Sequence, residues 1–176
     1  KGRYQFNKLN GVILGVMALI LILVNTNIYQ KEQVLKNGKL VLLELAPVDP
    51  RSLMQGDYMR LRFSIERNLL DKNKTADSKP TSQGLFIVNL NEHSVGTFSG
   101  ILNEKTLKDN QIKMQFRVRD NRIQLATHAF FFEEGTAKLY QAAQYGEFRV
   151  AENGELLLNN LRDKDYKVIG YNRPQN

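Results

Sequence analysis

The run GVILGVMALILILV at residues 11–24 has no charged or polar side chain, and it limits what the start of this chain can be. As a helix it is about 21 Å long, less than the roughly 30 Å hydrocarbon core of a bilayer. Extended to residues 9–28 it can cross that core, with its asparagines at the interfaces. A buried core helix and a cleaved signal peptide are the alternatives. Because the following NTNIYQ offers no small-x-small cleavage site, we expect an uncleaved transmembrane helix at 9–28.

The charges that flank the span say little about its orientation. Basic residues lie on both sides of it: Lys1, Arg3 and Lys8 before, and Lys31, Lys36 and Lys39 after. The positive-inside rule therefore gives nearly a tie. A short leading tail and a long trailing domain are the usual arrangement of a signal anchor. We expect a cytoplasmic tail at 1–8, a helical stalk at 29–38 that ends at Asn37-Gly38, and an extracytoplasmic domain at 39–176.

The domain has the sequence patterns of short antiparallel strands. Apolar runs bounded by turn residues occur at 39–46, 84–90 and 94–102, and QIKMQFRVR at 111–119 alternates apolar with polar side chains. Asp120-Asn121 and Asn153-Gly154 mark tight hairpins. These patterns predict strands that are polar on one face and apolar on the other.

Two further segments complete the predicted domain. A helix of two or three turns fits 133–144, with Leu139, Ala142 and Ala143 on its buried face. The polar segment 69–83 contains Pro80 and is predicted to be a mobile surface loop. The fold class that we predict is mainly β: an N-terminal transmembrane helix followed by an antiparallel β-sandwich or open barrel with one short helix.

The stretch PVDPRSLMQGDYMRLRFSI at 47–65 joins a turn signal to an alternating segment. Gly56 allows a positive φ, and the Asp57 carboxylate can accept backbone N–H bonds at the corner. In the predicted strand, one side carries Met59, Leu61, Phe63 and Ile65 and the other carries Tyr58, Arg60 and Arg62. We interpret the stretch mainly as a structural corner that starts a strand. A binding site on the side of Tyr58 is the alternative.

This stretch resembles the signature of the GDYXXLXY family of bacterial membrane-anchored proteins. Four residues match the name and Phe63 stands where the pattern has tyrosine; the matching residues are Gly56, Asp57, Tyr58 and Leu61, preceded by a similar lead-in at Pro47, Asp49, Pro50 and Arg51. The resemblance implies a single-pass protein of the bacterial inner membrane with a periplasmic or other extracytoplasmic domain, often encoded beside a multipass membrane protein. It also implies a suggested role in regulating an amylopullulanase, a starch-debranching enzyme.

Composition argues against several classes of function. The chain has no cysteine, so it forms neither a disulfide nor a thiolate metal site. Its net charge of +7 includes Lys1, Arg3 and Lys8 before the span, which leaves a mildly basic domain and argues against nucleic-acid binding. His93 and His128 have no acidic cluster beside them, and no glycine-rich phosphate or dinucleotide motif is present. We expect no cofactor, metal site or catalytic residue.

These patterns favour a non-enzymatic accessory or adaptor domain that is anchored in the lipid bilayer and binds a multipass membrane protein. Gly11 and Gly15 form a Gly-x-x-x-Gly face on which another helix can pack closely. One alternative is a ligand-binding or hydrolytic module at the corner of Asp49, Asp57 and Tyr58. Another is a regulator of a carbohydrate-active enzyme. The sequence leaves homo-oligomerisation open.

Overall fold

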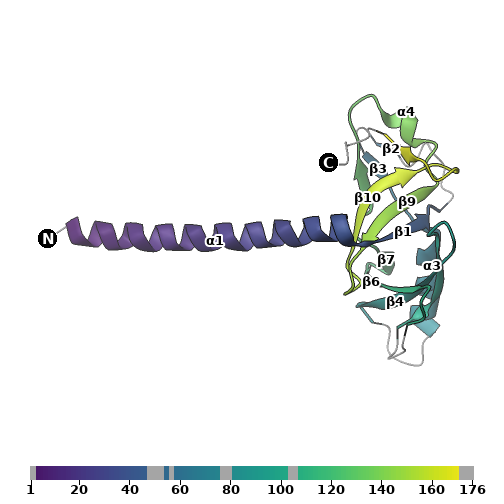
Figure 1. The fold of residues 1–176 in the computed structure, drawn as a ribbon, viewed down its shortest axis with the longest axis horizontal. Coiled ribbons are helices and arrows are strands. Elements are labelled where there is room, and N and C mark those ends of the chain that lie inside the picture. Colours follow the sequence, from purple (N-terminus) through teal and green to yellow (C-terminus); the bar gives the residue numbers. More distant parts are fainter. Residues whose placement is uncertain (1–2, 47–53, 56–57, 76–80, 103–106, 171–176) are drawn as a thin grey trace.

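A single long helix projects from a β-rich domain in the computed structural model, which describes residues 3–46, 54–55, 58–75, 81–102 and 107–170 (Figure 1). The helix, α1 (Arg3–Asn37), is continuous through the predicted span and stalk. Gly38 follows it, and a Cβ atom at this position would collide with the carbonyl oxygen of Val34. The Gly38 N–H instead donates a hydrogen bond to that oxygen at 2.9 Å. The predicted end of the helix is therefore confirmed, with glycine required by close backbone approach.

The strands form three antiparallel sheets within the described residues. In order across each sheet they are β1 (Lys39–Glu44), β9 (Tyr145–Val150), β10 (Leu156–Arg162) and β11 (Val168–Ile169); β2 (Met54–Gln55), β3 (Tyr58–Arg60) and β8 (Ala129–Phe131); and β5 (Gly96–Ile101), β4 (Gln83–Leu90), β6 (Gln111–Arg119) and β7 (Arg122–Gln124). The same part of the chain contains the helices α3 (Ser64–Thr75) and α4 (Ala137–Tyr140). The predicted fold class, mainly antiparallel β behind a long apolar helix, is confirmed.

Isolated bridges beside β1 connect the sheets. Leu42 on β1 forms a parallel bridge with Val95, just before β5, and the Leu42 N–H donates to the carbonyl oxygen of Ser94 at 2.9 Å. Leu45, just after β1, forms an antiparallel bridge with Phe63, just before α3. The sheets therefore enclose one core rather than two separate ones.

The hairpin of β6 and β7 follows its sequence pattern closely. β6 has the predicted bounds, and its apolar side chains Ile112, Met114 and Phe116 are buried. Asp120 and Asn121 have φ of 51° and 59°, as the two central residues of a type I′ hairpin turn require. The predicted turn is confirmed, and its geometry follows from two residue types that tolerate positive φ.

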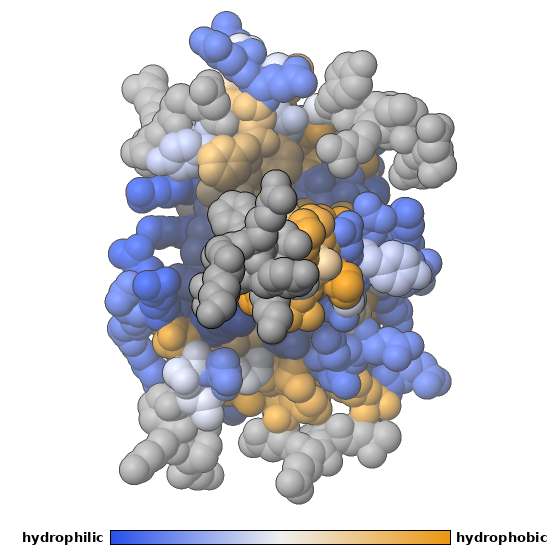
Figure 2. Space-filling model, turned by 90° about the vertical axis from the view of Figure 1, so that its left-hand side faces the viewer, coloured by the Kyte–Doolittle hydropathy of each residue, from blue (hydrophilic) through white to orange (hydrophobic). Residues whose placement is uncertain are grey.

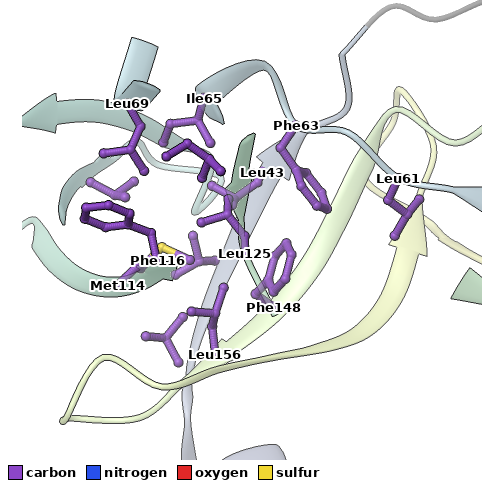
Figure 3. Packing of buried hydrophobic residues seen from close by; sticks show 14 of the residues in the cluster. Leu43, Leu61, Phe63, Ile65, Leu69, Met114, Phe116, Leu125, Phe148 and Leu156 are labelled. Carbon is purple, nitrogen blue, oxygen red and sulfur yellow. The ribbon is translucent and has the colours of Figure 1, made fainter. Parts of the chain in front are cut away.

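The core is filled from the two larger sheets, from α3 and from the segment that contains Leu61 and Phe63 (Figure 3). Each of these two side chains is 2% exposed, which confirms the predicted apolar face. The rings of Phe63 and Phe148 meet edge to face, with centroids 5.1 Å apart. A Cβ atom at Gly146 would lie 2.7 Å from the Phe63 ring, so glycine at this point of β9 makes room for the aromatic pair.

A carboxylate is buried beside this core. Glu147 on β9 is 2% exposed and forms an ion pair with Arg162 on β10, with 2.5 Å between Arg162 Nε and Glu147 Oε2. Burial alone would raise the pKa of Glu147, but hydrogen bonds from Asn159 and Arg162 and the charge of Arg162 bring the pKa below its usual value. The buried charge is therefore kept by partners on the neighbouring strand.

The strand predicted through residue 65 is wrong, and so is the loop predicted at 69–83 where it covers residues 69–75; residues 76–80 of that loop lie outside the described residues. β3 ends at Arg60, and α3 begins at Ser64 and continues to Thr75. Ile65, Leu69 and Asn73 are buried on one face of this helix at a spacing of four residues. Ile65 therefore continues the apolar alternation of the strand while it also begins a helical face, which concealed the change of structure.

The helix predicted at 133–144 is reduced to the single turn of α4. Its buried side chain is Tyr140, whereas Leu139 is 56% exposed. Gly135, with φ of +81°, has a non-helical backbone conformation and so prevents a helix from starting at residue 133. The ring of Tyr140 stacks on Phe132 with centroids 5.2 Å apart, so aromatic contact rather than apolar periodicity positions this segment.

Candidate functional site

The structure describes part of the predicted motif site. Asp49, Pro50, Arg51, Gly56 and Asp57 lie outside the described residues, so the corner that they are predicted to form stays a prediction. Tyr58 lies on β3 beside Phe131 of β8, with ring centroids 5.8 Å apart, and Phe131 is 74% exposed. Tyr58 and Phe131 therefore form an aromatic pair across two neighbouring strands, and the segment after β3 places Leu61 and Phe63 in the core.

A pocket of about 770 Å³ lies beside Tyr58. One wall consists of β3, the segment after it and the start of α3, and the other consists of the β6–β7 hairpin and the segment before β8. We call it the arginine pocket; its lining residues are Ala46, Tyr58, Arg60, Leu61, Arg62, Phe63, Glu66, Arg67, Leu70, Arg119, Asp120, Arg122, Ile123, Gln124, His128 and Ala129. The pocket thus includes all three motif residues that the structure describes.

The arginine pocket has a large excess of positive charge. Among the described lining residues there are two carboxyl groups, Glu66 and Asp120, and five arginines, which are Arg60, Arg62, Arg67, Arg119 and Arg122. Within the described residues, none of these arginines makes an ion pair at 4.0 Å or less. The guanidinium charges are therefore not neutralised by direct contact with the part of the chain that the structure describes.

His128 is affected by two of these charges. Burial lowers the pKa of His128 below its usual value, and the charges of Arg122 and Arg62 lower it further. Arg62 follows β3, whereas Arg122 lies on β7, so charges from two separate elements act on one imidazole ring. At neutral pH the ring is uncharged, with one nitrogen as a donor and the other as an acceptor.

Glu66 lies in the first turn of α3 and lines the pocket. It is the third residue of the helix, and its side chain is hydrogen-bonded to the backbone of Phe63, as in a capping box. Burial raises the pKa of Glu66 to about 7, although that hydrogen bond and the charge of Arg62 act to lower it. The Oε1 atom is buried and has no hydrogen-bond partner among the described residues. A partly protonated carboxyl group with an unused oxygen therefore lies in the pocket wall.

The sequence pattern places Arg60 and Arg62 on the side of Tyr58, and the pocket includes all three. The pattern did not reveal that Glu66 and His128 join them, because α3 was not foreseen and β7 and β8 lie far along the chain. The sequence feature that could have indicated the second side of the pocket is the pair Arg119 and Arg122, which flanks the Asp120-Asn121 turn. Among the described residues, no group of three His, Asp or Glu side chains lies close enough to hold a metal ion.

The second predicted site lies on α1. Gly11 and Gly15 are exposed, and a Cβ atom added at either position would meet no atom within 4 Å. Contacts of this helix with the domain are instead made near its C-terminal end, where Lys31 forms an ion pair with Glu155. The glycine face is therefore available to another helix.

Comparison with known protein families gives one match. A family model with the description "GDYXXLXY protein" matches residues 20–161, which is most of the chain and runs from the apolar segment into β10. The comparisons with curated proteins and with solved structures gave no match.

Proposed function

The chain belongs to the GDYXXLXY family, and we propose that it is a membrane-anchored accessory domain that binds a multipass membrane protein. In this proposal residues 1–8 are cytoplasmic, 9–28 cross the bacterial inner membrane, 29–38 form the stalk and 39–176 form the extracytoplasmic domain. The observation that carries the proposal is α1. It contains a candidate membrane span at Asn10–Asn37, and the most apolar part of this span is not buried against the domain. Such a surface needs lipid or another helix to cover it.

Side-chain donors at the end of the apolar run form hydrogen bonds within the helix. The side chains of Asn25, Thr26 and Asn27 donate to carbonyl oxygens four residues earlier, at 2.9, 2.8 and 2.8 Å. An unsatisfied polar group in hydrocarbon costs several kcal/mol. These bonds therefore support a span that continues to residue 28.

The domain begins close to the end of the proposed span. Lys31 is paired with Glu155 in the turn between β9 and β10, and it lies three residues after Ile28, or roughly 5 Å along a helix. Seen along α1, the face of the domain around the helix has apolar areas as well as hydrophilic ones (Figure 2). A face of this mixed character, held near the bilayer, is suited to contact with an extracytoplasmic part of a membrane partner.

Close helix packing on Gly11 and Gly15 is the proposed lateral contact. Lipid is as apolar as a helix surface, so association in a membrane depends on close packing and hydrogen bonds, which small residues permit. We expect Gly11→Leu combined with Gly15→Leu to remove the membrane partner that co-purifies with the full chain in mild detergent. Mass spectrometry of the captured proteins measures this loss.

A matched control uses the opposite side of the same helix. Ile13→Leu combined with Met17→Leu keeps the four-residue spacing and the apolar character, and it should leave the captured partner in place. Because nothing in the protein lies within 4 Å of the added Cβ atoms at Gly11 and Gly15, the domain itself should fold normally. Retention of every captured protein by the glycine variant would contradict the lateral interface.

A second function, ligand binding beside Tyr58, is favoured by the arginine pocket. Ligand sites are typically concave, with volumes of roughly 300–1,000 Å³, largely apolar walls and a few convergent polar groups. The pocket beside Tyr58, at about 770 Å³, is within this volume range and combines apolar with charged side chains, and Glu66 and His128 in its wall have shifted pKa values. This function is compatible with the accessory role, since the pocket and the glycine face lie on different parts of the chain.

A further inference from the structure

We propose that the arginine pocket binds a phosphate group, carried by a soluble phosphate ester or by a lipid, together with an apolar part of the same molecule. The proposal rests on the ligand-binding function of the pocket and names the ligand class.

The charge of the pocket favours phosphate over carboxylate. Among the described lining residues, five arginines leave a net charge of about +3 even with both carboxyl groups ionised. A carboxylate supplies one negative charge, whereas a phosphate monoester supplies close to two at neutral pH and offers three acceptor oxygens. The planar guanidinium fork also matches phosphate oxygens in a bidentate geometry.

The arginines come from separate elements that surround the pocket. Arg60 and Arg62 lie on and after β3, Arg67 lies on the first turns of α3, and Arg119 and Arg122 lie on the β6–β7 hairpin. A phosphate oxygen can therefore be approached from more than one wall. Nearby positive charges repel one another. The binding of an anion that neutralises several of them is therefore more favourable than its binding to a single surface arginine.

The remaining walls fit the apolar part of the ligand. Leu70 and Tyr58 are partly exposed in the pocket wall, and the side chains of Leu61, Phe63 and Ile123 lie in the same wall with 2–3% of their surface exposed. A volume of about 770 Å³ is far more than an inorganic phosphate ion fills. The pocket therefore suits an amphipathic phosphate compound better than the free ion.

The start of α3 gives two further contributions. A helix N-terminus carries partial positive charge, and Phe63, Glu66 and Arg67 bring the first turn of this helix into the pocket wall. The buried Oε1 of Glu66 has no hydrogen-bond partner among the described residues. Burial also raises the pKa of Glu66 to about 7, so at neutral pH this carboxyl group is partly protonated and repels a phosphate group less than a fully ionised one does.

Isothermal titration of the full chain with phenyl phosphate tests the proposal. The protein is delipidated in neutral detergent and placed in nanodiscs of phosphatidylcholine. We expect saturable binding at one site, and an affinity at least tenfold lower for Arg62→Gln combined with Arg122→Gln. Arg117→Gln is the matched control and should bind as the original chain does. Arg117 is exposed on β6, two residues from Arg119, and does not line the pocket.

Nanodiscs that also contain phosphatidic acid identify the source of the phosphate. Weaker binding of phenyl phosphate in these discs supports a lipid headgroup as the ligand, and unchanged binding supports a soluble ester. Equal affinity of the double arginine variant, or no saturable binding in phosphatidylcholine discs, would overturn the proposal. Binding of benzoate without binding of phenyl phosphate would overturn the phosphate assignment and leave ligand binding standing. Partner capture through α1 tests the accessory function separately, since both arginine variants keep Gly11 and Gly15.

Discussion

Glu66 and Glu147 show how the surroundings of a single carboxyl group decide its charge. Glu147 is the more buried of the two, yet its pKa is lowered, because Asn159 and Arg162 hydrogen-bond to it and Arg162 lies in direct contact. Glu66 has a raised pKa, because its hydrogen bond with the Phe63 backbone and the more distant charge of Arg62 do not offset its burial. Glu147 is therefore part of a structural ion pair, whereas Glu66 is a titratable group at the edge of a pocket.

The raised pKa of Glu66 makes the stability of the fold depend on pH. The folded chain holds this proton up to about pH 7, whereas an ordinary glutamate with a pKa of 4.5 releases it earlier. The stability that results is complete below pH 4.5 and is lost as the pH rises through 7. The Glu66→Gln variant has no carboxyl proton to lose at this position. As the pH rises from 5 to 8, its unfolding free energy should therefore increase by about 1–2 kcal/mol relative to that of the original chain, allowing for the partial exposure of Glu66.

Urea unfolding of the full chain in micelles, followed by circular dichroism, measures this gain. Glu134→Gln, at an exposed position before α4, is the control and should follow the pH profile of the original chain. If the Glu66→Gln profile ran parallel to that of the original chain, the account of Glu66 as a buried acid would be wrong.

At the scale of elements, α3 separates what the sequence pattern predicts from what it conceals. The β6–β7 hairpin was predictable, because alternation and turn residues agree locally. The start of α3 was not, because the alternation of Leu61, Phe63 and Ile65 is equally compatible with a strand that continues. The helical period appears only in the buried residues Ile65, Leu69 and Asn73. Because Asn73 is polar, an apolar pattern does not include it. Its side chain is buried through hydrogen bonds with Thr81, a tertiary contact that the local pattern does not reveal.

The packing of α3 gives a direct prediction. Leu69 is 0% exposed and belongs to the same buried cluster as Phe116 (Figure 3). Leu69→Ala should lower the unfolding free energy by about 2–5 kcal/mol, because it removes buried methyl groups and leaves a cavity. Asn68→Ala, on the exposed side of the same helix, should change it by less than about 0.5 kcal/mol. Equal effects of the two substitutions in urea unfolding would contradict the burial of this helix.

At the scale of the whole molecule, the sequence was sufficient for the fold class and insufficient for the candidate site. The apolar run, the turn pairs and the alternating strands are local patterns, and they predicted a long helix and an antiparallel β domain. The arginine pocket is assembled from β3, α3 and β7, whose neighbourhood depends on tertiary packing. Arg60 and Arg62 were recognisable as a polar side, but their proximity to Arg122 and His128 required the structure.

The central claim is that α1 crosses the membrane with the domain on the extracytoplasmic side, and thiol labelling tests it most directly. The chain has no cysteine, so Lys164→Cys, exposed between β10 and β11, introduces the only thiol. We predict that a membrane-impermeant maleimide labels this variant in spheroplasts with intact inner membranes. Lys1→Cys, in the proposed cytoplasmic tail, should be labelled only after those membranes are opened. Labelling of Lys164→Cys only after the membranes are opened would contradict the account.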